Sequence, residues 1–284
     1  MTQQIMACID GSNFSRAVCD AAAWASLRLS APLTFVHVID KEANPVVHDS
    51  SGQIGLGSRE HLLEELAALD EQRGKIAQQQ GRLMLEAACQ RATEDGVSEP
   101  STRQRNGEVV EALYELESEI RLLVLGKRGE SAASASAHLG SNLERVVRAL
   151  HCPILITVAE FTAPQRVLIA FDGSETAHKA VEKVASSPLL AGLECHVVLV
   201  GVDTEAHRTQ LTWVEQQLEG RGGKVITSIQ SGEIELALRH YKQLHGIDML
   251  VMGAYGHSRI RHLLVGSTTT DMIRHASVPI LIIR

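Results

Sequence analysis

Aromatic residues are scarce in this sequence, at 3% of its 284 residues, which argues against the stacking platforms that bind single-stranded nucleic acid. Basic residues form no stripe and the formal net charge is −7, a balance unfavourable to nucleic acid or an anionic membrane as the main partner. No apolar run approaches the ~20 residues of a membrane span, and the first residues lack a signal-peptide pattern. We therefore expect a cytoplasmic protein that binds neither nucleic acid nor membrane.

Motifs for metal binding and for common phosphoryl-transfer chemistry are also missing. The 13 histidines form no HExxH motif and no paired spacing with cysteine, so no metal site and no catalytic residue is predicted. A G-x4-GK[ST] loop does not occur either. The cysteines are scattered without a CxxC pair, and we expect them to be buried, reduced thiols. They are Cys8, Cys19, Cys89, Cys152 and Cys195.

What the sequence does contain is an internal repeat. Four blocks recur in the same order in both halves of the chain, and the Asp-Gly-Ser triplet of the first block is identical in the two copies. Such order is typical of a duplication, and the segment EFTAPQ, between the last strand of one copy and the first of the next, separates the copies. We predict domains at 1–160 and 165–284. The matching blocks are 5–12 with 167–174, 107–113 with 232–238, 122–129 with 249–256, and 138–157 with 264–283.

Each copy alternates short Val/Ile/Leu runs with helical segments. Such runs indicate strands of a parallel sheet that is covered on both faces. The fold class predicted is therefore α/β, with two tandem doubly wound domains and a mostly parallel five-stranded sheet in each. The first copy is the longer one because it contains the polar stretch 41–59 and a long helix predicted over 60–92. This helix has an apolar stripe, for which packing on its own sheet is the default interpretation and partner binding the alternative.

One strand-to-helix loop of the second copy carries the clearest chemical signal. Gly253 and Gly256 follow a predicted strand, and Gly266-Ser267 opens a predicted helix after nine further residues. Glycine lets backbone N–H groups approach an anion closely. The free N–H groups and the positive dipole end of a helix suit phosphate, and Thr268 lies in the first turn. The loop therefore predicts a phosphate cradle.

The spacing Gly-x2-Gly-x9-Gly-Ser, the AFDGS block and the closing VPILII strand resemble the ATP-binding universal stress proteins across both copies. The resemblance implies that Asp172 holds the nucleoside end of an adenine nucleotide and that the Val202 backbone borders the adenine. It places ribose and phosphates on the glycine loop, and Mg²⁺ would arrive with the phosphates. The resemblance also implies that the two halves pair through 153–157 and 279–283. A homodimer is a further alternative, which the sequence does not decide.

The first copy departs from this pattern. Ten residues rather than nine separate its glycine pair from the next Gly-Ser, and they are small and polar. The loop therefore either binds nucleotide or only connects a strand to a helix, with Ser141 and Glu144 as a capping box. Lys127 and Arg128 add positive charge there. The corresponding candidate residues are Asp10, Val38, Gly126, Gly129, Gly140 and Ser141.

Together with the glycine loop, the resemblance implies a non-enzymatic regulatory protein of the stress response that binds ATP. A slow ATPase at the same site is one alternative. It would need a base or a positioned water near the γ-phosphate, for which Asp271 is the candidate in 253–271. A nucleotide-free scaffold for protein partners is the other alternative. The sequence does not reveal which stress or partner is involved.

Overall fold

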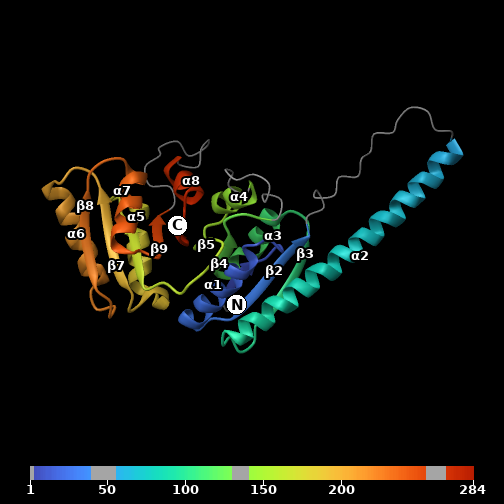
Figure 1. Cartoon of the computed structure of the whole chain (residues 1–284), viewed down its shortest axis with the longest axis horizontal. Helices are drawn as coiled ribbons and strands as arrows, with labels where there is room; N and C mark the ends of the chain where they lie inside the picture. Colours follow the sequence, from blue (N-terminus) through green and yellow to red (C-terminus); the bar gives the residue numbers. More distant parts are fainter. Residues whose placement is uncertain (1–2, 40–55, 130–140, 254–266) are drawn as a thin grey trace.

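The structure is a computed structural model, and it describes residues 3–39, 56–129, 141–253 and 267–284. Its strands form one ten-stranded sheet in the order β3-β2-β1-β4-β5-β10-β9-β6-β7-β8 (Figure 1). The five strands of each half pair in parallel with one another. The prediction of two tandem α/β domains with parallel five-stranded sheets is confirmed, and the two sheets are continuous.

The first domain follows the predicted alternation of strands and helices. Its elements are β1 (Gln4–Cys8), α1 (Ser15–Leu29), β2 (Leu33–Ile39), α2 (Leu56–Glu94), β3 (Ser101–Asn106), α3 (Val109–Leu116), the 3₁₀ turn η1 (Glu117–Glu119), β4 (Ile120–Gly126), α4 (Ser141–Ala149) and β5 (Ile154–Thr157).

The second domain repeats this order with a much shorter second helix. Its elements are β6 (Arg166–Ala170), α5 (Glu175–Ser186), the 3₁₀ turn η3 (Pro188–Leu190), β7 (Glu194–Val200), α6 (Glu205–Leu218), β8 (Val225–Gln230), α7 (Ile234–His245), β9 (Met249–Gly253), α8 (Ser267–Arg274) and β10 (Ile280–Ile283).

The two faces of the sheet carry separate hydrophobic cores. Neighbouring residues of a strand point to opposite faces, so Ile5 belongs to one core and Met6 to the other. Helices α1, α2, α5 and α6 cover the first face, whereas α3, α4, α7 and α8 cover the second. Each core runs through both domains without a break, which is the layer arrangement of a doubly wound fold.

Strands β5 and β10 join the two halves of the sheet. They pair antiparallel, with Leu155 opposite Leu281 and Ile156 opposite Ile280. These side chains are almost fully buried. The Arg28 guanidinium of α1 adds a polar contact across the same junction, donating to the Leu189 carbonyl oxygen at 3.0 Å. The junction therefore combines a strand pair, core packing and hydrogen bonds.

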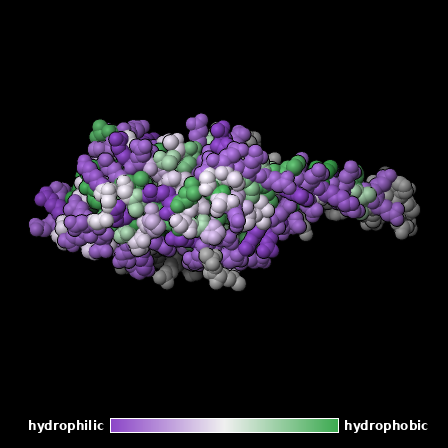
Figure 2. Space-filling view, turned by 90° about the horizontal axis from the view of Figure 1, so that it is seen from below, coloured by the Kyte–Doolittle hydropathy of each residue, from purple (hydrophilic) through white to green (hydrophobic). Residues whose placement is uncertain are grey.

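Helix α2 is longer than predicted at both ends, and only its C-terminal part packs on the sheet. Leu85, Ala88 and Ala92 are buried in the core, while residues 64–80 include no buried side chain. The helix runs past the sheet and projects from the molecule (Figure 1). Figure 2 shows this projection as largely hydrophilic with separate hydrophobic residues along it. Within the described residues, no helix is both long and apolar enough to cross a membrane.

Burial is expected to make Cys19 almost unreactive toward alkylating reagents in the folded protein. The Cys19 side chain lies in the core, and its burial, together with the neighbouring Asp20 carboxylate, raises the thiol pKa from an ordinary 9.0 to about 12. At pH 8 the reactive thiolate is thus roughly 1,000-fold rarer than in the unfolded chain. Mass spectrometry after iodoacetamide treatment, with and without urea, checks this. Equal labelling rates for Cys19 in the two states would contradict the prediction.

Candidate nucleotide site

The predicted binding residues of the second domain meet at the carboxyl ends of three neighbouring strands. Asp172 follows β6, Val202 follows β7, and Gly253 ends β9. Strand β6 lies between β7 and β9 in the sheet. The chain leaves β6 toward β7 on one side and returns through β9 on the other, so this position is a topological switch point. Open α/β sheets bind their ligands at such points.

Asp172 shapes the turn that starts helix α5. Its Oδ1 accepts a hydrogen bond from the Ser174 backbone N–H at 3.0 Å. Gly173 between them has a positive φ of 71°, a conformation in which glycine is favoured. The Ser174 hydroxyl then accepts from the Ala177 N–H at 3.2 Å and caps the helix. The Asp-Gly-Ser block therefore fixes the position of the Asp172 carboxylate at the strand end.

Gly253 allows a close approach of helix α5 to β9. A Cβ atom added at Gly253 would lie 3.2 Å from the backbone carbonyl carbon and oxygen of Thr176. Backbone atoms in the first turn of a capped helix have little freedom to move away. The glycine therefore brings the end of β9 against the start of α5, beside the Asp172 turn.

Val202 is exposed at 75%, and its backbone is held by a residue that the sequence analysis did not find. The His207 Nδ1–H of α6 donates to the Val202 carbonyl oxygen at 2.7 Å. Asp203 next to it accepts two hydrogen bonds from Arg208, both at 2.7 Å, and this guanidinium lowers the Asp203 pKa. A histidine seven residues after the end of β7 has no distinctive sequence signal, so only the structure reveals it.

The glycine loop itself lies largely outside the described residues. Gly256, Gly266 and Gly140 fall there, so their role stays a prediction. Helix α8 begins at Ser267 and includes Thr268, while α4 begins at Ser141. Both helices therefore start where the Gly-Ser pairs predicted a helix.

In the first domain, the structure brings Asp10 and the loop Gly126–Gly129 together. Asp10 Oδ1 accepts from the Ser12 N–H at 3.0 Å, as Asp172 does from Ser174. A Cβ at Gly129 would lie 2.7 Å from Asp10 Oδ2, and one at Gly126 would lie 2.8 Å from the Phe14 Cβ. Both glycines are thus needed for close packing around the Asp10 turn.

Val38 differs from Val202 in its surroundings. It lies inside β2 and is buried. Strand register shows the reason, because Ile5 pairs with Leu33 as Val167 pairs with Cys195. Leu33 therefore corresponds to Cys195. Val38 lies five residues after Leu33, so it corresponds to Val200, which lies five residues after Cys195, and not to Val202. The two valines were predicted as equivalents, and the register corrects that equivalence.

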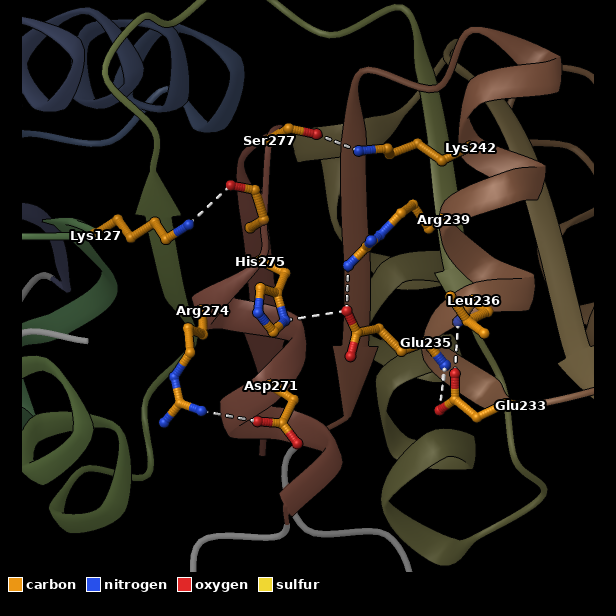
Figure 3. A network of polar contacts seen from close by, with 11 residues as sticks. Lys127, Glu233, Glu235, Leu236, Arg239, Lys242, Asp271, Arg274, His275 and Ser277 are labelled. Atoms are coloured by element: carbon orange, nitrogen blue, oxygen red, sulfur yellow. Dashed lines mark hydrogen bonds and ion pairs between the residues drawn. The ribbon is translucent and has the colours of Figure 1, made fainter. Parts of the chain in front are cut away.

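The Lys127 side chain contacts the second domain across the domain junction. Its Nζ donates to the Ala276 carbonyl oxygen of the second domain at 2.9 Å (Figure 3). Its backbone N–H donates to Thr157 of β5 at 2.9 Å. Partial burial and the neighbouring Arg128 lower the pKa of the ammonium group. This lysine therefore stabilises the contact between the domains.

Helix α8 is tied to α7 on the same side of the molecule. His275 Nδ1 lies 3.0 Å from Glu235 Oε1, which also pairs with Arg239 (Figure 3). Asp271 accepts from Arg274 at 3.2 Å, one helical turn further on. The Asp271 carboxylate, the candidate base for hydrolysis, is thus engaged in an ion pair.

Comparison with known proteins agrees with this architecture. A profile of the universal stress protein family matches residues 1–157 and 164–284. Universal stress protein Slr1230 of Synechocystis sp. is 36% identical over 286 residues, covering 99% of this chain and all of the relative. Universal stress protein YxiE of Bacillus subtilis is 30% identical over 158 residues, covering 55% of this chain and 99% of its own.

The fold agrees as well. The crystal structure of a universal stress protein from Archaeoglobus fulgidus superposes with a TM-score of 0.71 at 20% identity, covering 99% of this chain and 98% of that one. The chain belongs to the universal stress protein family, as a tandem two-domain member.

Proposed function

We propose that this protein is an ATP-binding regulatory protein of the cytoplasmic stress response, with its principal nucleotide site in the second domain. The convergence of Asp172, Val202 and Gly253 at the carboxyl ends of β6, β7 and β9 carries the proposal. The start of α8 at Ser267 supports it, because a helix N-terminus favours phosphate. Mg²⁺ would be held mainly by the nucleotide phosphates.

The domain limits 1–160 and 165–284 are part of the proposal. We assign each unit one candidate site and assign their pairing to β5 and β10. In the first domain, Lys127 is engaged by Ala276, which removes one cation from phosphate binding there. The first site is therefore the weaker of the two.

Binding rather than hydrolysis is favoured by the surroundings of α8. Hydrolysis requires a base or a residue that positions water at the γ-phosphate. Asp271 is the acidic residue closest in sequence to the glycine loop, and its carboxylate pairs with Arg274. A switch between ATP-bound and ATP-free states needs only the cradle.

Replacing Asp172 with alanine is expected to weaken ATP binding by about tenfold or more, since a charge-assisted hydrogen bond to the nucleotide is lost. Calorimetric titration of the full chain with ATP and Mg²⁺ measures this. Asp10→Ala tests the first domain in the same way, and a smaller effect is expected there. Asp70→Ala, on the exposed part of α2, is the matched control.

Thermal unfolding of each variant verifies that the fold is retained. Wild-type protein that binds no ATP would overturn the proposed function and leave the tandem scaffold. Equal affinities for Asp172→Ala and Asp70→Ala would remove Asp172 from the site.

A further inference from the structure

The projecting part of α2 carries an apolar stripe that the described residues of this chain leave exposed. Leu69, Ile76 and Leu83 are 50%, 49% and 58% exposed. They recur every seven residues, and Leu66 precedes Leu69 by three. Aliphatic side chains in this spacing form the seam of a two-stranded coiled coil. The stripe thus has the pattern of a helix that packs against another helix.

The stripe cannot pack on the sheet of its own domain, because α2 contacts that sheet only further along the chain. Buried positions in the described part of α2 begin at Gly81. A Cβ at Gly81 would lie 2.5 Å from the His37 ring, which is itself held by the Ile9 carbonyl oxygen. The helix touches β2 here, and before this point it leaves the domain. We call residues 64–83 the arm.

The charges along the arm are separated by sign. Residues 64–71 contain four acidic and no basic side chains, whereas residues 72–83 contain three basic and no acidic ones. Two such arms side by side in parallel register would place like charges together. In antiparallel register, the acidic part of each arm runs along the basic part of the other. The arm is therefore electrostatically complementary to an antiparallel copy of itself.

We propose that the arm forms an antiparallel two-stranded coiled coil with the arm of a second copy of this chain. With Leu66 beside Leu83 of the second copy, the layers of the stripe meet in register and a two-fold axis passes near the middle of the arm. Arg73 and Gln80 occupy the remaining stripe positions. Polar residues in a seam cost stability but fix register and partner number. A two-fold interface uses the same surface on both copies.

The test is the mass of the full-length protein in solution. Sedimentation equilibrium is run at several concentrations up to about 100 µM, where dimers are favoured by mass action. Ile76→Asp is expected to raise the dimer dissociation constant by about tenfold or more, because it places a charge in the seam. Gln78→Asp adds the same charge away from the stripe on the same exposed segment and is expected to leave the dimer intact.

Salt distinguishes the two orientations. Raising NaCl from about 0.05 to 0.5 M screens exposed charges, so an antiparallel dimer weakens, whereas a parallel one tightens. A monomeric wild type, or a dimer that survives Ile76→Asp unchanged, would overturn the proposal. Tightening with salt would overturn the antiparallel orientation. Circular dichroism of Ile76→Asp at low concentration verifies that the domains remain folded.

Discussion

Leu155→Asp is expected to destabilise the whole protein by about 4 kcal/mol or more, a large share of the stability of an ordinary domain. Leu155 is fully buried in β5 and lies opposite Leu281 of β10. An aspartate there would place an unpaired charge in a core that both domains share. Urea unfolding followed by circular dichroism measures the loss.

Leu236→Asp is the matched control. Leu236 is 61% exposed on α7, so its replacement is expected to change stability by no more than about 0.5 kcal/mol. The two substitutions are chemically identical, but one is made in a buried strand and the other on an exposed helical turn. Similar unfolding midpoints for both variants would mean that β5 does not hold the domains together as described.

Gly253→Val is expected to weaken ATP binding by about tenfold or more and to lower stability by about 1–3 kcal/mol, the usual effect of overpacking. The added side chain would collide with the Thr176 backbone, separate α5 from β9 and displace the Asp172 turn. Titration calorimetry and thermal unfolding of the same sample report the two effects.

Gly126→Val makes the same change in the first domain, where the Phe14 side chain is the obstacle. It is expected to destabilise the protein comparably while leaving the second site's affinity for ATP unchanged. Gly74→Val serves as the control, since nothing lies within 4 Å of a Cβ at Gly74. Unaltered ATP binding by Gly253→Val would contradict the proposed site.

The fold could be predicted from the sequence because the duplication supplies the same pattern twice. Apolar runs such as Ile5–Cys8 and Val167–Ala170 are short and continuous, as buried parallel strands require. The repeated Asp-Gly-Ser blocks form turns after β1 and β6, where Gly11 and Gly173 adopt a positive φ.

Besides His207, two features escaped the sequence analysis for physical reasons. The apolar stripe of α2 predicted that this helix packs on the sheet. A 39-residue helix spans about 58 Å, however, whereas a seven-residue strand spans only about 23 Å. Most of the helix therefore has no sheet beneath it. The hydrogen bond from Lys127 to Ala276 depends on how the domains meet, which no local pattern encodes.

The order of the strands determines where the sheet can grow. Each domain alone would end in an apolar edge, β5 or β10, and exposed edges of this kind recruit further strands. Because β5 and β10 pair with each other, neither edge is left exposed. The edges that remain are β3, with the sequence STRQRN and exposed along nearly its whole length, and the partly exposed β8. Two arginines on β3 oppose the addition of another strand. The duplication thus removes both apolar edges from solvent and leaves a charged strand, β3, at one end of the sheet.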